Sequence, residues 1–241
     1  MKKLGIVAHS AEGASLCFIT ACRHGSELLG AYMHPEIVMS AIPMALSMPG
    51  WESGDMDAVA DHLAMGVRVA AEGGADFFIC PDNTAHIVLE TIADSLPIPG
   101  LHIADVVCSE IRSRGFKRVA LMGTEWTMTG PVYERALRES GMEQIVPEEA
   151  DRKTIHSAIF DDLCNGWVTD SIESNFVRIT QKLKDRGAEC VILGCTEIPL
   201  VLNDNNSLLP TIDSTRLLAR RAVELCISDA ELVVRNGWVQ L

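Results

Sequence analysis

The sequence predicts an α/β protein built from two pseudo-symmetric domains, each a mostly parallel sheet flanked by helices. Short apolar runs alternate with longer segments whose apolar residues lie three and four apart, which is the pattern of buried strands followed by amphipathic helices. The longer segments end in glycine, as helices often do. A motif that begins at Gly74 occurs again at Gly187, which indicates an internal duplication.

Four apolar runs are predicted to be strands. They are almost uniformly hydrophobic and too short for buried helices, which is typical of strands covered on both faces in a parallel sheet. In chain order they are LGIVA (4–8), FFIC (77–80), RVALMG (118–123) and CVILG (190–194).

The segments between these runs are predicted to be helices, most clearly at 55–74 and 174–187. A parallel sheet of this kind binds ligands beyond the carboxyl ends of its strands, where the helices begin. The polar residues that directly follow each predicted strand are therefore the candidates for a functional site.

The internal repeat compares GADFFICPDNT, from Gly74, with GAECVILGCTE, from Gly187. Without gaps, Asp82 aligns with Cys195. Each copy reads as a helix end, a glycine turn, a buried strand and a polar cluster. Gly-Ala-acidic before a buried strand is common in α/β proteins, so coincidence is the alternative. A true duplication predicts two similar half-chains whose strand ends face one cleft, with Asp82 and Cys195 on opposite sides of a ligand.

Composition narrows the class of partner. The chain has 241 residues, 48% of them hydrophobic and 22% charged, which suits a soluble globular protein with a full core. Its net charge of −13, with scattered Lys and Arg, argues against nucleic acid and favours a small molecule or a protein as partner. No apolar stretch approaches the roughly 20 residues that span a bilayer. The start, MKKLGIVAHS, is interpreted as the first strand of a cytoplasmic protein.

Cofactor and metal signals are weak. The eight cysteines include no CxxC pair and the histidines are dispersed, so most cysteines are expected to be small buried side chains and no metal site is predicted. GIVAHSAEG lacks the G-x-G-x-x-G spacing, and GTEWTMTG is not a phosphate loop. No nucleotide cofactor is expected.

At the two repeat motifs the sequence resembles the aspartate/glutamate racemase family, which includes hydantoin racemases and related isomerases and decarboxylases. Segments 97–107, 119–137 and 209–219 are also similar to family patterns and stand in the same order. The resemblance implies a cofactor-independent enzyme acting on an amino acid or a derivative, with a possible homodimer. It also implies two domains, 1–99 plus 210–241 and 100–209, with the active site at their interface.

Racemisation removes a weakly acidic proton from one face of a carbon and returns one to the other, and the family normally uses two cysteines. The resemblance assigns Cys195 as one of them, at a strand-to-helix junction that would favour a thiolate. Asp82 stands where the other cysteine is expected, and its alternative role is a helix N-cap. Cys80, still within the apolar run, is interpreted as core.

An Asp–Cys pair raises an energetic difficulty. An ordinary Asp titrates near 3.9 and an ordinary Cys near 8.5, so the resting pair is expected to be carboxylate and thiol. Asp82 could then abstract a proton while Cys195 donates one, but the reverse direction needs the opposite protonation. The gap of roughly 4.6 pH units corresponds to about 6 kcal/mol. Burial could raise the pKa of Asp82, and a helix terminus could lower that of Cys195.

The resemblance also implies residues that hold the substrate's α-carboxylate and amino group. As isolated residues, the same side chains would be ordinary capping and turn groups. His86 is expected to be a satisfied helix histidine. The candidate substrate-binding residues are Ser10, Asn83, Thr84, Thr124, Thr127, Thr196 and Glu197.

The substrate's side chain is less constrained. Aspartate-specific members commonly carry a Pro-x-Arg element before the first catalytic segment, and residues 40–56 contain no arginine or lysine. Met44, Met48 and Trp51 favour an apolar or adaptable pocket wall instead. A second carboxylate is therefore not expected in the substrate.

Three functions remain open. The leading hypothesis is a racemase or epimerase that needs no pyridoxal phosphate, with Asp82 and Cys195 as the proton-transfer groups. A decarboxylase or another isomerase of the same superfamily could instead use Cys195 alone. A binding relative that kept the fold and lost turnover is the third.

Overall fold

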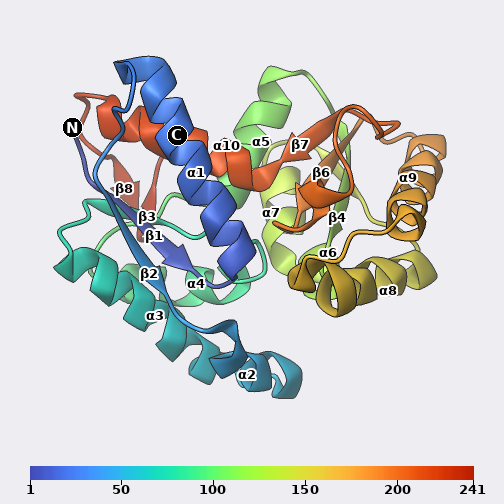
Figure 1. Ribbon diagram of the computed structural model, residues 1–241, viewed down its shortest axis with the longest axis horizontal. Coiled ribbons are helices and arrows are strands. Elements are labelled where there is room, and N and C mark those ends of the chain that lie inside the picture. Colours follow the sequence, from blue (N-terminus) through green and yellow to red (C-terminus); the bar gives the residue numbers. More distant parts are fainter. The chain divides into compact units, whose positions relative to one another are not determined.

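The computed structural model describes all residues, 1–241, and the chain divides into two compact units (Figure 1). The first unit contains residues 1–106 and 215–241, and the second contains residues 107–214. Each unit by itself is an α/β structure around a parallel sheet, as the sequence predicts. No helix combines the length and the apolar character that crossing a bilayer would require.

The first unit is built on a three-stranded parallel sheet with the order β2-β1-β3. Ile6 at the centre of β1 lies beside Met39 on one neighbour and Ile79 on the other. Gly100 continues the sheet as a bridge between Phe78 and Trp238. The strands are β1 (Leu4–Ala8), β2 (Ile37–Ala41) and β3 (Phe77–Ile79), with a terminal antiparallel pair β8 (Val234–Arg235) and β9 (Trp238–Val239).

Helices flank this sheet, and the division between the units falls within α5 and after the first residue of α10. Asp55 caps α3 by accepting a hydrogen bond from the Ala58 amide at 3.2 Å. The helices are α1 (Ala11–Leu29), α2 (Met48–Ser53), α3 (Met56–Glu72), α4 (His86–Ile92), α5 (Ile103–Ser113) and α10 (Ser214–Ile227), with 3₁₀ turns at Met44–Leu46 and Ala93–Ser95.

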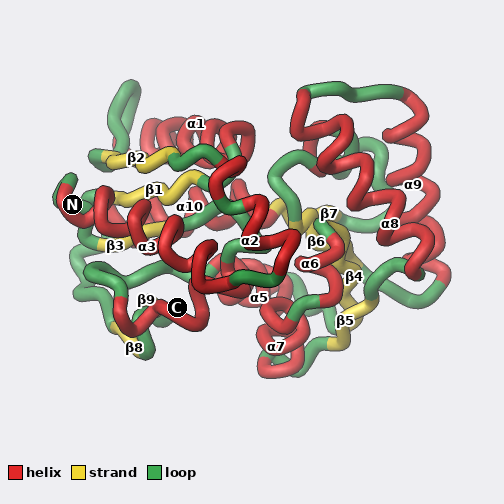
Figure 2. The backbone as a smooth tube through the Cα atoms, turned by 90° about the horizontal axis from the view of Figure 1, so that it is seen from below, coloured by secondary structure: helices red, strands yellow, loops and turns green.

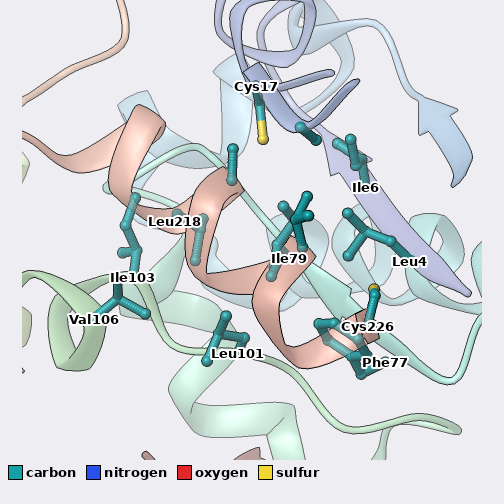
Figure 3. Close-up of a cluster of buried hydrophobic side chains, with 14 of the residues drawn as sticks. Leu4, Ile6, Cys17, Phe77, Ile79, Leu101, Ile103, Val106, Leu218 and Cys226 are labelled. Atoms are coloured by element: carbon teal, nitrogen blue, oxygen red, sulfur yellow. The ribbon is translucent and has the colours of Figure 1, made fainter. Parts of the chain in front are cut away.

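A single apolar cluster fixes the strand ends of this unit (Figure 3). Ile6 and Ile79, from β1 and β3, have no exposed surface, and neither has Leu218 of α10. Cys17 and Cys226 belong to the same cluster, as expected for small buried thiols. Burying these side chains holds β1 and β3 in one register, and that register positions the residues that follow them.

The second unit has a four-stranded parallel sheet with the order β5-β4-β6-β7 (Figure 2). The strands are β4 (Arg118–Gly123), β5 (Glu143–Ile145), β6 (Cys190–Gly194) and β7 (Thr211–Asp213). The helices are α6 (Glu125–Thr129), α7 (Pro131–Glu139), α8 (Glu149–Ser157) and α9 (Asp170–Asp185), and α8 runs on into a π-helical segment (Ala158–Asp162) and a 3₁₀ turn (Leu163–Asn165).

The predicted strands are confirmed. Runs 4–8, 118–123 and 190–194 match β1, β4 and β6 residue for residue, and run 77–80 loses only Cys80. Pro81 follows Cys80 and has no amide hydrogen for a strand ladder, which explains the early end. The helix predicted over 55–74 is α3, and the one predicted over 174–187 is the later part of α9.

The repeat has the same local geometry in both units. Gly74 and Gly187 adopt positive φ angles of 83° and 88°. In the first unit the Asp76 carboxylate accepts a hydrogen bond from the Lys3 amide at 2.7 Å. In the second, the Glu189 carboxylate accepts one from the Arg118 amide at 2.9 Å. The acidic residue of each copy thus ties the glycine turn to the chain entering the neighbouring strand, so the duplication is structural.

Replacing Gly74 with alanine is expected to lower the free energy of unfolding by about 1–2 kcal/mol, because an L-residue is strained at positive φ. Space is not the obstacle, since a Cβ there would meet only the Lys3 side chain, at 3.5 Å. Gly74→Asn should lose less, because asparagine tolerates this conformation better. Urea unfolding of the wild type and the two variants measures both losses in the free energy of unfolding. An alanine variant as stable as the wild type would show that the positive φ angle causes no strain at this position.

Candidate active site

His9 and Asp82 meet at the carboxyl end of the first unit's sheet. His9 directly follows β1, and Asp82 lies three residues after β3. The two are 73 positions apart, the same separation as in the strand pair Leu4 and Phe77, so the register of β1 and β3 brings them side by side. His9 Nδ1 lies 2.5 Å from Asp82 Oδ2.

The other carboxylate oxygen of Asp82 binds the backbone. Asp82 Oδ1 accepts hydrogen bonds from the amides of Thr84 at 2.8 Å and Ala85 at 3.3 Å. Asp82 therefore caps the turn that leads into α4, which begins at His86. Its side chain is still 19% exposed. Asp82 is thus a turn residue rather than the expected N-cap of α4, whose cap position is Ala85, and its side chain remains partly exposed.

Burial is the largest single effect on the pKa of each member of this pair, but their mutual charge and hydrogen bond together outweigh it. Burial would raise the pKa of Asp82, but the charge and hydrogen bond of His9, with the Ala85 amide, hold that pKa below its ordinary value. Burial would lower the pKa of His9, and the Asp82 carboxylate raises it above the ordinary value instead. The expectation that burial could bring the pKa of Asp82 towards that of a thiol is therefore wrong.

The second nitrogen of His9 is held by Ser47. His9 Nε2 lies 2.8 Å from Ser47 Oγ, and that hydroxyl can donate to the Met44 carbonyl at 3.4 Å. Hydrolases use a similar Ser–His–Asp chain, but Ser47 is 1% exposed and cannot reach a substrate as a nucleophile. It orients the imidazole.

Neither His9 nor Ser47 is among the site residues predicted from the sequence. The sequence offered one signal for His9, which is its position directly after the first strand. In a parallel sheet, a residue at that position lies near the polar residues that follow a neighbouring strand. No local pattern distinguishes Ser47, which sits between the 3₁₀ turn at Met44–Leu46 and α2.

Two residues near Asp82 have the structural roles expected of them. His86 is fully buried; its Nδ1 donates to the Asp82 carbonyl at 2.9 Å and its Nε2 accepts from the Ile103 amide at 3.4 Å. Burial, with His102 nearby, lowers the pKa of His86 to about 3, so the ring is neutral. Cys80 is fully buried, and burial strongly raises the pKa of its thiol. It is core.

In the second unit Cys195 directly follows β6 and is half-buried. Its Sγ donates a hydrogen bond to Glu197 Oε2 at 2.9 Å, and the Thr196 hydroxyl donates to the same oxygen at 2.7 Å. Glu197 is 2% exposed. A protonated thiol fits this contact, because a thiolate has no hydrogen to donate and its negative charge would be repelled by the carboxylate.

The helix expected after Cys195 is a single 3₁₀ turn, Ile198–Leu200. Turn-forming residues NDNNS follow at 203–207 and end it. One turn has no appreciable macrodipole, so the predicted helix-terminus stabilisation of a thiolate at Cys195 is wrong. Glu197 is the group that orients the sulfur.

Thr124 occupies the position in the second unit that His9 has in the first. It directly follows β4, and it precedes Cys195 by the same separation as in the strand pair Gly123 and Gly194. Thr124 Oγ1 accepts from the Thr127 amide at 3.1 Å and lies 3.1 Å from the Thr127 hydroxyl. The structure brings these two candidates together as the cap of α6, both buried.

The remaining candidates also lie at strand ends. Ser10 caps α1 by accepting from the Gly13 amide at 3.2 Å. Asn83 and Thr84 are buried in the turn after β3. In the segment 40–56, Met44 and Met48 are half-buried and Trp51 is buried. Each unit therefore carries one cluster of polar side chains beyond the carboxyl ends of its own strands.

Comparison with known proteins identifies the family. The model of the Asp/Glu/hydantoin racemase family matches residues 26–222. Broad specificity amino-acid racemase RacX from Bacillus subtilis (strain 168) is 28% identical over 176 residues, which cover 70% of this chain and 73% of RacX.

Solved structures of racemase-like proteins are also similar to this chain. A Yersinia pestis protein proposed to be an Asp/Glu racemase has a TM-score of 0.86 and 27% identity, over 95% of this chain and 100% of that one. PH1733, an aspartate racemase homologue from Pyrococcus horikoshii OT3, has a TM-score of 0.80 and 28% identity, over 95% and 100%. The chain therefore belongs to the Asp/Glu/hydantoin racemase family.

Proposed function

We propose that the protein is an amino-acid racemase or epimerase that works without pyridoxal phosphate or a metal. Asp82 and Cys195 transfer protons at the α-carbon from opposite faces of the bound substrate. In each turnover one group removes the α-proton and the other delivers a proton to the opposite face.

The equivalent positions of Asp82 and Cys195 carry this proposal. They align in the repeat, and each follows the corresponding strand of its own unit, β3 or β6. Both side chains are partly accessible, whereas Cys80 and Cys190 on the same strand segments are buried. A duplicated fold that offers a proton-transfer group at the same place in each half suits a reaction with two mirror-related steps.

The substrate's carboxylate is proposed to bind to hydroxyls and amides beside these groups. Asn83 and Thr84 supply them next to Asp82, and Thr196 next to Cys195, with Ser10, Thr124 and Thr127 completing the site. Hydrogen bonds to that carboxylate also stabilise the enolate-like charge that forms when the α-proton leaves. Glu197 accepts from the Cys195 thiol at 2.9 Å and so can hold the sulfur in a fixed direction.

The proposed substrates are amino acids without a required second carboxylate. The segment 40–56 has no arginine or lysine to pair with one, and its methionines suit apolar side chains. RacX, the relative from Bacillus subtilis, is described as having broad specificity, which is consistent with a permissive site.

Incubation in deuterium oxide with a panel of amino acids tests the proposal. We expect deuterium at the α-carbon together with loss of optical activity, with no added pyridoxal phosphate and undiminished by a chelator. Proton NMR and chiral chromatography measure the two signals. No exchange with any member of a panel of neutral, acidic and aromatic amino acids would contradict the proposed function.

A decarboxylase is the second candidate, because His9 holds the pKa of Asp82 low and thereby makes its carboxyl a poor proton donor. One-directional chemistry, in which Cys195 protonates an enolate left by loss of carbon dioxide, needs no donor on the other face. Carbon dioxide release from an α-disubstituted malonate, without racemisation of any amino acid, would favour this candidate.

A further inference from the structure

We propose that Trp126, His156 and Phe160 form an aromatic wall beside the substrate's side chain, and that the protein prefers amino acids whose side chain is aromatic or a large aliphatic group. This inference rests on the proposed function, because it names the substrate class of that same site. Trp126 belongs to α6, His156 to α8 and Phe160 to the π-helical segment that continues α8. The site residues predicted from the sequence include none of the three.

The three rings of the aromatic wall contact one another. The ring centroids of Trp126 lie 5.2 Å from that of His156 and 5.9 Å from that of Phe160, and both contacts are T-shaped, a favoured arrangement of aromatic side chains. The centroids of His156 and Phe160 are 4.9 Å apart. Each of the three residues is half-buried, so the cluster leaves part of its aromatic surface open. Ligand sites are lined largely by side chains of this kind.

A hydrogen bond attaches the wall to the first turn of α6. His156 Nδ1 accepts from the Glu125 amide at 3.2 Å. That amide belongs to the first residue of α6, where the helix itself supplies no carbonyl partner. Because Nδ1 is the acceptor, the ring carries its hydrogen on Nε2, and its plane is fixed relative to the α6 backbone. The helices α6 and α8 therefore hold Trp126 and His156 in a defined arrangement (Figure 1).

The same turn of α6 adjoins the proposed proton-transfer group of this unit. A Cβ added at Gly123 would lie 3.2 Å from the Thr127 side chain, and one added at Gly194 would lie 3.4 Å from the Thr127 methyl carbon. Thr127 thus packs against the last residues of β4 and β6, and Cys195 directly follows β6. Trp126 precedes Thr127 in the chain, so the aromatic wall begins next to a group proposed to bind the substrate.

The helix that carries the other two rings is irregular at Phe160. The π-helical segment Ala158–Asp162 follows α8, and Gly166, with a φ angle of 74°, ends the 3₁₀ turn after it. Turns of the π type are rare and occur frequently at functional sites. Here the irregular turn falls at the residue whose ring meets both His156 and Trp126.

Charge near the wall opposes a second carboxylate in the substrate. Three acidic residues adjoin the rings in sequence, namely Glu125, Asp161 and Asp162. The pKa of Lys153 is raised first by its hydrogen bond to Glu149 and also by the charge of Glu125, so Glu125 already has a positive partner. Asp161 is exposed, and water screens its attraction for a cation. The rings therefore favour an apolar side chain, and a basic one, which aromatic rings also attract, is the alternative that the test separates.

The kcat/KM values for a series of substrates test the wall. The series contains phenylalanine, leucine, alanine, lysine and glutamate as single enantiomers. We expect phenylalanine to exceed alanine by about 100-fold or more, because an apolar pocket discriminates by about 10-fold or more for each methylene group. Lysine and glutamate should both lie below phenylalanine and leucine.

Phe160→Ala should lower kcat/KM for phenylalanine by about 10-fold or more and change that for alanine by less than about threefold. A loss that depends on the size of the substrate's side chain is not the result of general destabilisation. Phe160→Leu keeps an apolar side chain and should restore most of the preference. The matched control is Trp167→Ala, which removes an aromatic side chain that is 63% exposed in the same part of the chain and should leave the ratio unchanged.

Calorimetry with α-methylphenylalanine is a readout that needs no turnover, since this compound has no α-hydrogen to transfer. We expect it to bind the wild type at least about 10-fold more tightly than 2-aminoisobutyrate, its counterpart without the ring. Phe160→Ala should remove most of that difference. If circular dichroism shows that Phe160→Ala does not fold, Trp126→Leu takes its place.

The outcomes separate this inference from the proposed function. Equal kcat/KM for phenylalanine and alanine, or an equal loss for both in Phe160→Ala, overturns the aromatic wall while the racemase activity stands. A preference for lysine over phenylalanine also overturns it. Absence of exchange with every substrate, together with tight binding of α-methylphenylalanine that Phe160→Ala abolishes, overturns the proposed function and supports the wall as a binding surface.

Discussion

Replacing Cys195 with alanine is expected to lower racemisation by about 10³-fold, because a positioned acid or base contributes about 10²–10⁴-fold and no neighbouring group replaces the thiol. The Glu197 carboxylate, which is hydrogen-bonded to the thiol, already accepts from both Cys195 and Thr196. The loss should appear in kcat more than in KM, since alanine removes a proton donor and leaves the proposed carboxylate-binding residues intact.

The matched control is Cys22→Ala, a partly buried thiol on α1. Its rate should stay within about twofold of the wild type, because its thiol is not among the proposed site residues. The comparison measures the racemisation rate of each protein from both enantiomers, together with exchange at the α-carbon by NMR. If Cys195→Ala kept a tenth or more of the wild-type rate in both directions, Cys195 would not be a proton-transfer group.

Replacing Ile79 with alanine is expected to lower the free energy of unfolding by about 3–4 kcal/mol, within the range for large buried side chains. Ile79 has no exposed surface, lies beside Ile6 in the sheet and belongs to the cluster that α10 covers. The change removes three carbons and leaves a cavity that the closely packed neighbours cannot fill. Chemical denaturation followed by circular dichroism measures it.

Two variants calibrate that result. Ile79→Val should lose only about 1 kcal/mol, because it removes a single methylene group. Met65→Ala on α3 should stay within about 0.5 kcal/mol of the wild type, since Met65 is 48% exposed. An Ile79→Ala loss no larger than that of Met65→Ala would mean that this cluster does not hold the sheet together.

Four strands, β1, β3, β4 and β6, were predictable because the signal for them is local. Each of these four is a nearly continuous apolar run, and the residues that end it are close in sequence, such as Pro81 after β3 and Gly194 at the end of β6. The repeat was visible for a related reason, since Gly74 and Gly187 need the same positive φ and each precedes an acidic side chain with the same backbone partner. The same pattern indicated that Asp82 and Cys195 hold equivalent places.

Local patterns misjudged the surroundings of those two residues. The polar cluster after β6 suggested a helix, but the turn-forming residues from Asn203 leave only a 3₁₀ turn. The Cys195 thiol therefore interacts with the Glu197 carboxylate and not with a helix dipole. Burial of Asp82 suggested a raised pKa, but the direction depends on His9, which lies 73 residues earlier in the chain.

The sequence by itself determined where β1, β3, β4 and β6 lie, and it indicated that the fold is duplicated and which two residues occupy matching strand ends. Only the tertiary structure decided that His9 faces Asp82 and that Ser47 faces His9. The physical reason is that strand order and register, β2-β1-β3 with Ile6 beside Ile79, set which strand ends become neighbours. That choice depends on packing between distant segments, whereas hydrophobic periodicity reports only on residues a few positions apart.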